Sequence, residues 1–238
     1  MSKLKSIHTS RTMMFLELAK VMDHSIDTSD FSGSLALNVT GKKSNSGAEK
    51  TAMYLKRLYS FDRQQPSFAA LAFFWKTAET AEKPMLALLY AICVDDLLAE
   101  SLAVLEASVP GEKLSVEFFE NILQKNHPNH YSPNSCKSIA QNLASSWKQA
   151  GFIAGKVSIS RTQPNISYRI ACFAFLLAYI QGKRGDFIWS SLPVQALGLP
   201  ESQLRNLAIE CSKRDLMEYQ HAGSVTTISF AALLNKIG

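Results

Sequence analysis

A run of 65 residues, from position 121 to 185, contains no Asp or Glu but eight Lys or Arg side chains. The chain has 20 acidic residues in 238, so about five or six are expected in a run of this length. A surface that binds a polyanion explains the asymmetry, because a carboxylate facing phosphate weakens binding whereas each Lys or Arg releases counterions. A helical core segment whose surface drifted basic is the alternative. The run indicates an anionic partner, with nucleic acid as the first candidate.

The helix predicted for residues 133–150 carries amides, hydroxyls and amines at its outward positions, and no acid. Such side chains can donate to phosphate oxygens or hydrogen-bond to base edges in a major groove, which admits one helix. A solvated face and lone solvated cations are the alternative. The candidates for contact with duplex DNA are Asn134, Lys137, Ser138, Gln141, Asn142, Ser145 and Lys148 on the helix, Lys156 and Arg161 on the segment after it, and Arg169 at the start of the next helix.

A second candidate recognition helix is predicted for residues 200–214. Acids return here, since Glu201 and Glu210 share its outward face with basic and amide side chains. Two acids on one face more often mark a protein-packing or solvent surface, so the residues on this helix are secondary candidates. They are Gln203, Arg205, Asn206 and Lys213.

The elements around the first helix predict a winged helix-turn-helix unit. An amphipathic helix over 114–126 is followed by a polar turn, and Ser132 and Pro133 form an N-cap and a first helical position. Gly151 ends the helix, and residues 152–159 suit a short strand that leads to a turn at 163–165.

The elements around the second helix predict a similar unit. A helix over 186–196 and a tight turn at 197–199 precede the helix over 200–214. Strands over 216–221 and 225–230 are joined by Ala222 and Gly223 and complete a hairpin. We therefore predict a mostly α fold, a helical bundle with two winged helix-turn-helix-like units that carry short β-hairpins.

The rest of the chain predicts an N-terminal helical region over residues 1–109. It has helices over 9–22, 48–59, 66–82 and 84–107, and a flexible polar loop near 23–50. The break at 109–112 separates it from a first winged-helix-like unit over 110–182, and a second follows over 183–238.

The sequence carries no signature of a catalytic or cofactor site. It has no Gly-rich phosphate loop, no CxxC pair, no HExxH and no GxSxG. Asp95 and Asp96 diverge by about 100° on a helix, and His127 and His130 read as turn residues rather than metal ligands. We expect a protein that is not an enzyme and has no metal, no cofactor and no small-molecule substrate.

Composition indicates a folded protein of the cytoplasm. The four cysteines are widely spaced and fit reduced core positions, and the N-terminus is a poor signal peptide. The most apolar run, 170–180, is about half the length that spans a bilayer, so we expect a buried helix and no membrane partner.

The order of several segments resembles the BrxA family of the BREX bacteriophage-defence systems. The segments are YLKRLY over 54–59, LLYAICVDDLLAE over 88–100 and SPNSCKSIAQNLASSWKQAGFI over 132–153. The resemblance covers most of the chain from Tyr54 onward. It implies a small, mostly helical, non-enzymatic bacterial protein that binds DNA beside larger defence proteins, and it assigns no catalytic residue.

The leading hypothesis is a cytoplasmic accessory protein of antiviral defence that binds duplex DNA with weak sequence preference. Two alternatives remain. The chain could be a helical scaffold whose basic surface docks an acidic protein or RNA, or a transcriptional regulator that binds a palindromic operator as a dimer.

Overall fold

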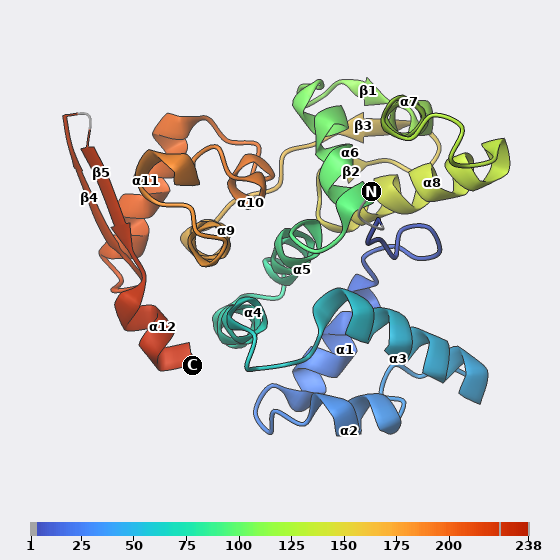
Figure 1. The fold of residues 1–238 in the computed structure, drawn as a ribbon, viewed down its shortest axis with the longest axis horizontal. Coiled ribbons are helices and arrows are strands. Elements are labelled where there is room, and N and C mark those ends of the chain that lie inside the picture. The colour runs from blue at the N-terminus through green and yellow to red at the C-terminus, as the bar shows by residue number, and fades with distance from the viewer. Residues whose placement is uncertain (1–3, 224, 238) are drawn as a thin grey trace. The chain divides into compact units, whose positions relative to one another are not determined.

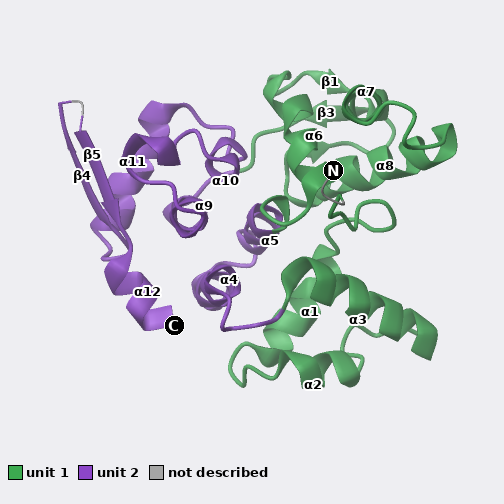
Figure 2. Cartoon of the chain, in the orientation of Figure 1, with its two compact units in different colours: residues 1–60, 91–164 green, residues 61–90, 165–238 purple. Residues whose placement is uncertain are grey.

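The computed structural model describes residues 4–223 and 225–237, which form twelve α-helices, one 3-10 helix and five short strands (Figure 1). The fold is mostly α with short β-hairpins, which confirms the predicted fold class. The chain divides into two compact units, each built from two separate stretches (Figure 2). Unit 1 combines Met1–Ser60 with Ala91–Pro164, and unit 2 combines Phe61–Tyr90 with Asn165–Gly238. The units therefore do not follow the three consecutive ranges expected from the sequence.

Three helices occupy the first stretch of unit 1: α1 (Phe15–Ser25), α2 (Phe31–Ala36) and α3 (Asn45–Tyr59). The prediction of a loop near 23–50 is wrong over α2 and the start of α3. Asp30 caps α2 by accepting from the Gly33 N–H, and Phe31 and Leu35, one turn apart, are buried. A short polar-looking segment thus forms a helix because two apolar side chains on one face reach the core.

The second stretch of unit 1 folds as a winged helix-turn-helix-like unit. Its elements are α6 (Asp96–Glu106), β1 (Lys113–Leu114), α7 (Val116–Asn126), α8 (Pro133–Gln149), β2 (Ile153–Ala154) and β3 (Ile159–Arg161). The strands form an antiparallel sheet in the order β1-β3-β2. Ser132 caps α8 as predicted, and Gly151, at φ 87°, follows its end. At Gly155 an added Cβ would lie 2.0 Å from Ser158 O, so the β2–β3 turn requires glycine.

The first helix of this unit, α6, lies before the predicted boundary at 109–112. The helix predicted over 84–107 is in fact two helices, α5 (Lys83–Ile92) and α6, because Asp95 adopts an extended backbone and caps α6. The Trp147 Nε1–H donates to Ser101 Oγ at 2.8 Å, and Glu100 lies 2.8 Å from His127 Nε2 in the turn between α7 and α8. Contacts from α6 thus hold both the helix α8 and the turn that precedes it.

Unit 2 contains α4 (Pro66–Thr77), α9 (Tyr168–Ile180), the 3-10 helix η1 (Gly185–Ile188), α10 (Leu192–Gln195), α11 (Glu201–Ser212), β4 (Glu218–Ala222), β5 (Val225–Ser229) and α12 (Ala231–Ile237). Residues 170–178 of α9 are all buried, which confirms the predicted buried helix. The helix predicted over 186–196 is wrong. Pro193 lacks an N–H and is tolerated only in the first turn of a helix, so η1 and a new four-residue helix that begins at Leu192 form instead.

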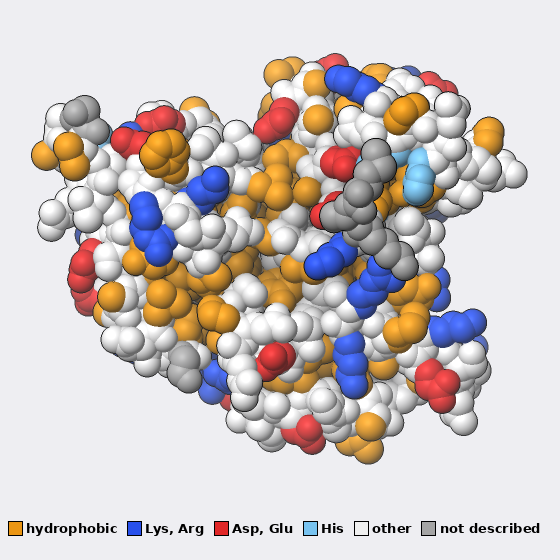
Figure 3. Space-filling model, in the orientation of Figure 1, with side chains coloured by type: hydrophobic (Ala, Val, Ile, Leu, Met, Phe, Trp, Pro, Cys, Tyr) orange, Lys and Arg blue, Asp and Glu red, His pale blue; other side chains and the backbone are white. Residues whose placement is uncertain are grey.

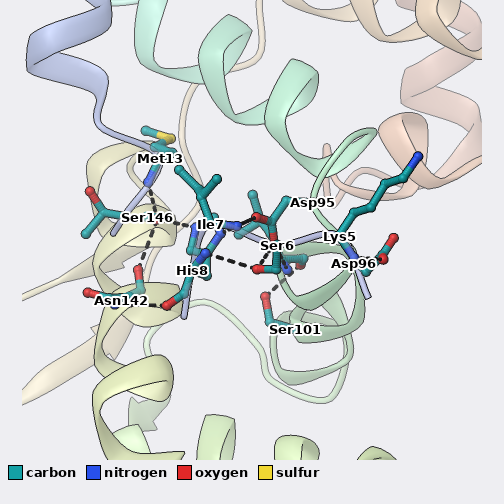
Figure 4. Close-up of polar contacts among 12 residues, drawn as sticks. Lys5, Ser6, Ile7, His8, Met13, Asp95, Asp96, Ser101, Asn142 and Ser146 are labelled. Atoms are coloured by element: carbon teal, nitrogen blue, oxygen red, sulfur yellow. Dashed lines mark hydrogen bonds and ion pairs between the residues drawn. The ribbon is translucent and has the colours of Figure 1, made fainter. Parts of the chain in front are cut away.

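The segment before α1, residues 5–14, forms what we call the strap (Figure 4). The Ile7 N–H and the Ser6 hydroxyl donate to the buried Asp95 carboxylate at 2.7 and 2.8 Å. His8 Nδ1 lies 3.0 Å from Asp95 Oδ2, and His8 Nε2 lies 2.9 Å from Ser146 Oγ on α8. The predicted helix over 9–22 therefore begins only at Phe15, since the residues before it join α6 to α8.

Burial raises the pKa of the Asp95 carboxyl, but the interactions with His8, the Leu98 N–H and Ser6 outweigh it and hold that pKa below its usual range. The carboxyl therefore binds its proton less tightly in the folded chain than in the unfolded one. Its contribution to stability is complete above the unfolded pKa and is lost as the pH falls through the lower folded pKa.

Asp95→Ala is expected to lower the free energy of unfolding by about 3–5 kcal/mol, because it leaves buried donors and His8 without their acceptor. Asp96→Ala is the matched control, since Asp96 is exposed, and a much smaller loss is expected. Urea denaturation measures both. The difference between wild type and Asp95→Ala should be constant above about pH 5 and shrink below it. Equal losses in the two variants would contradict the role of Asp95.

Candidate nucleic-acid interface

The exposed side of α8 brings together most of the residues predicted on it. Asn134, Lys137, Ser138, Gln141 and Lys148 are exposed, while Cys136, Ile139, Ala140, Leu143 and Trp147 are buried on the opposite side. Neither Lys137 nor Lys148 pairs with a carboxylate within the described chain. The helix therefore presents two cations, two amides and a hydroxyl without acidic competition.

Two residues predicted on α8 lie closer to the interior. Asn142 is half-buried, and its Nδ2–H donates to the His8 carbonyl of the strap at 2.9 Å. Ser145 is also half-buried and accepts from Gln149 Nε2 at 3.4 Å. Asn142 is thus already used inside unit 1 and leaves the set of candidates. Sequence spacing could not reveal this, because the partner lies 134 residues away.

The β2–β3 turn extends the exposed side of α8. Residues 154–158 are all exposed, and Val157 at the tip is 99% exposed. The Lys148 Nζ donates to the Gly155 carbonyl at 2.5 Å, which joins the last turn of α8 to the hairpin. Lys156 therefore belongs to the same surface as Lys148, as the sequence predicted.

Arg161 does not belong to that surface. It is 4% exposed, its guanidinium donates to the Thr162 carbonyl and to Gln163 Oε1, and it lies 4.9 Å above the Phe152 ring. Burial lowers the pKa of Arg161. The prediction of a phosphate contact is wrong because Arg161 pairs in register with the buried Ile153 and faces inward.

Arg169 is a structural residue of unit 2. Its guanidinium lies 3.4 Å from Glu82 Oε2 and 3.8 Å from Glu79 Oε1, and it stacks over the Tyr168 ring at 4.9 Å. The acids that neutralise Arg169 stand almost ninety positions earlier in the chain, outside the acid-free run. Arg169 therefore leaves the set of candidates as well.

The exposed side of α11 differs from that of α8 because its cations are paired. Arg205 contacts Glu201, Asp186, Tyr219, His221 and Thr226 at 2.7–3.2 Å. Burial lowers the pKa of Arg205, but the hydrogen bonds to Tyr219, Glu201 and Asp186 raise it by more. Lys213 lies 3.3 Å from Glu210. Gln203 and Asn206 are exposed. Arg205, in contrast, uses its donors to hold α11, η1 and the β4–β5 hairpin together.

The cluster of Asp95, His8 and Ser146 has the residue types of a hydrolase triad. Its serine, however, is not accessible to a substrate. Ser146 is 0% exposed, and its hydroxyl contacts His8 Nε2, accepts from the Met13 N–H at 2.8 Å and donates to the Asn142 carbonyl at 3.0 Å. A nucleophile needs an open side and a free hydroxyl. The cluster therefore has the geometry of a structural network.

The described residues also bear on metal binding, disulfide formation and membrane crossing. No group of His, Cys, Asp and Glu there could hold a metal ion, and the four cysteines form no disulfide. No helix in the same residues has the length and apolarity to cross a bilayer.

Arg205→Lys is expected to weaken the protection of the β4–β5 amides against hydrogen exchange, because an ammonium has three donors and cannot span the five partners of the guanidinium. Arg214→Lys is the matched control, since Arg214 contacts only Glu210 and the Tyr168 ring in the described chain. Exchange rates followed by mass spectrometry measure the effect. Unchanged protection in Arg205→Lys would show that this residue does not hold the hairpin.

Comparisons with protein-family models, with curated proteins and with solved structures each found no match. The candidate interface is therefore defined by the geometry of this chain alone. It consists of the exposed side of α8 with Asn134, Lys137, Ser138, Gln141 and Lys148, together with Lys156 on the β2–β3 turn.

Proposed function

We propose that the protein binds duplex DNA through α8 and the β2–β3 hairpin, in the manner of a winged helix. The observation that carries the proposal is the contrast in pairing. Lys137, Lys148 and Lys156 are exposed without a carboxylate partner in the described chain, whereas Arg169, Arg205 and Lys213 are paired with acids. Unpaired cations on one surface favour phosphate, because binding releases counterions without breaking an internal ion pair.

The shape of the surface suits a DNA groove. The major groove is about 12 Å wide and admits one α-helix, whose diameter with side chains is about 10–12 Å, and α8 is a regular helix of 17 residues. Asn134 and Gln141 can hydrogen-bond to base edges. Lys148 and Lys156 lie at the β2–β3 hairpin, which would run beside the DNA backbone. Lys148 uses one donor on Gly155 and keeps two for phosphate. Because only a few side chains on this surface can read bases, we expect a weak sequence preference.

The setting we propose is a bacterial phage-defence system of the BREX type, in which the protein is a non-enzymatic cytoplasmic accessory that works beside other defence proteins. The support is the resemblance to BrxA over residues 54–59, 88–100 and 132–153. The last of these segments contains the whole of α8 and the start of β2. The resemblance and the unpaired cations therefore point to the same surface.

The double variant Lys137→Glu/Lys148→Glu is expected to lower affinity for a labelled duplex at least about 30-fold, because it removes two phosphate contacts and adds repulsion. Lys183→Glu/Lys236→Glu, which changes two exposed lysines of unit 2, carries the same change in net charge and should bind nearly as wild type. Fluorescence anisotropy measures affinity, and circular dichroism checks the fold. Equal losses in both doubles would reject α8 as the interface.

The salt dependence of the affinity tests how many lysines contact a phosphate. If Lys137, Lys148 and Lys156 each reach a phosphate, log K should fall with log salt with a slope of about −3. Tighter binding to RNA than to duplex DNA, or to an acidic protein, would support the scaffold alternative instead. Tight binding of a dimer to one palindrome would support a regulator.

A further inference from the structure

We infer that the strap forms one edge of the DNA-binding surface and that Arg11 contacts a backbone phosphate beside the groove that receives α8. The inference rests on the proposed function and extends it to a segment more than a hundred residues away in the sequence. Arg11 lies outside the acid-free run of residues 121–185, and no charge pattern in the sequence points to it.

The strap follows one edge of α8 over its last two turns. Asn142 donates to the His8 carbonyl, Ser146 Oγ accepts from the Met13 N–H, and Gln149 Oε1 accepts from the Phe15 N–H at 3.2 Å. These three helix positions are separated by four and three residues, so they lie along one side of the helix. The strap is therefore a neighbour of the exposed side of α8 along its C-terminal half.

The β2–β3 hairpin borders the opposite edge. Successive helical residues are about 100° apart, which places Lys137, Gln141 and Lys148 along one line and Asn142, Ser146 and Gln149 along another. Asn134, Ser138 and Ser145 lie between the two lines. Because Lys148 contacts Gly155 and Gln149 contacts the strap, the exposed side of α8 is framed by the hairpin on one edge and by the strap on the other.

Arg11 is an exposed cation of this framing strap and lies on its turn, whereas Lys5, also exposed, lies at its start beside Asp96. The Ser10 and Arg11 N–H groups both donate to the Ile7 carbonyl at 2.9 Å, which folds residues 7–11 into a tight turn. Thr9, Ser10 and Arg11 are exposed on that turn, whereas Ile7, His8 and Met13 on either side of it are buried. The buried residues thus hold the turn at the surface of unit 1.

The guanidinium of Arg11 is positioned and yet free to bind an anion. It lies 5.0 Å from the centre of the Tyr54 ring on α3, and its Nη1–H donates to the Ser10 carbonyl at 3.0 Å. No carboxylate pairs with it in the described chain. An arginine that stacks on an aromatic ring keeps its remaining in-plane N–H donors for phosphate. Holding it in place beforehand also lowers the entropy lost on binding.

The surroundings of Arg11 carry the matching charge. On the face shown in Figure 3, Lys and Arg side chains gather over α1 and α3. On α3, which supplies Tyr54, Lys50, Lys56 and Arg57 are exposed with a single acid, Glu49. Phosphate oxygens beside Arg11 would therefore meet more basic than acidic side chains along α3.

The test is the binding of Arg11→Gln to a labelled duplex, with Arg11→Lys and Lys236→Gln as companions. Arg11→Gln is expected to weaken binding about fivefold and to reduce the salt slope by about 1, because one phosphate contact is lost. Arg11→Lys should restore the slope but only part of the affinity, since the ammonium cannot stack and bind in the same way. Lys236→Gln should bind as wild type.

The outcomes separate this inference from the proposed function. Wild-type affinity and slope in Arg11→Gln, together with weak binding of Lys137→Glu/Lys148→Glu, would overturn the role of the strap and leave α8 as the interface. Wild-type binding in both would reject the surface around α8 as the interface, whereas a wild-type protein that does not bind the duplex would reject the DNA function itself. The melting temperature of Arg11→Gln should lie close to that of wild type, because an exposed side chain with one carbonyl contact and one ring contact contributes little to stability. A large drop with unchanged affinity would show that Arg11 is a structural residue.

Discussion

The buried carboxylate of Asp95 is the interaction on which unit 1 depends. It caps α6 through the Leu98 N–H, accepts from Ser6 and Ile7 of the strap, and faces His8, which contacts Ser146 on α8. A buried charge is stable only when several donors surround it, so these segments must come together for the carboxylate to be satisfied. The same side chain thus sets where α6 begins, where the strap lies and which edge of α8 is covered.

The pairing of cations distinguishes the exposed side of α8 from that of α11. In unit 2, Arg169 and Arg205 complete ion pairs that hold helices and a hairpin together. In unit 1, Lys137 and Lys156 stay exposed and unpaired within the described chain, and Lys148 contacts only a carbonyl. Net charge alone would treat these residues alike. Their partners separate the cations that stabilise the fold from those that remain for a ligand.

Local signals in the sequence predicted much of the fold but not the contacts between distant residues. Ser132, Pro133 and Gly151 set the ends of α8 correctly, and the apolar stripe from Cys136 to Trp147 is buried as expected. The wrong predictions concern contacts between residues that are far apart in the sequence. Arg161 and Asn142 looked outward by spacing alone, yet each meets an inward partner, and the acids that pair with Arg169 lie far away along the chain. The interleaving of the two units has the same origin, because charge and periodicity do not report which stretches pack together.

The strap also constrains the order in which the molecule can fold. His8 and Ser146 are 138 residues apart, so their contact closes one of the longest loops in the chain. Long closures lose more chain entropy and form late relative to local helices. During synthesis, the strap must therefore wait until α8 has left the ribosome before His8 gains its contact with Ser146. Until then the strap does not connect α6 to α8, and the side of α8 that borders the strap stays uncovered.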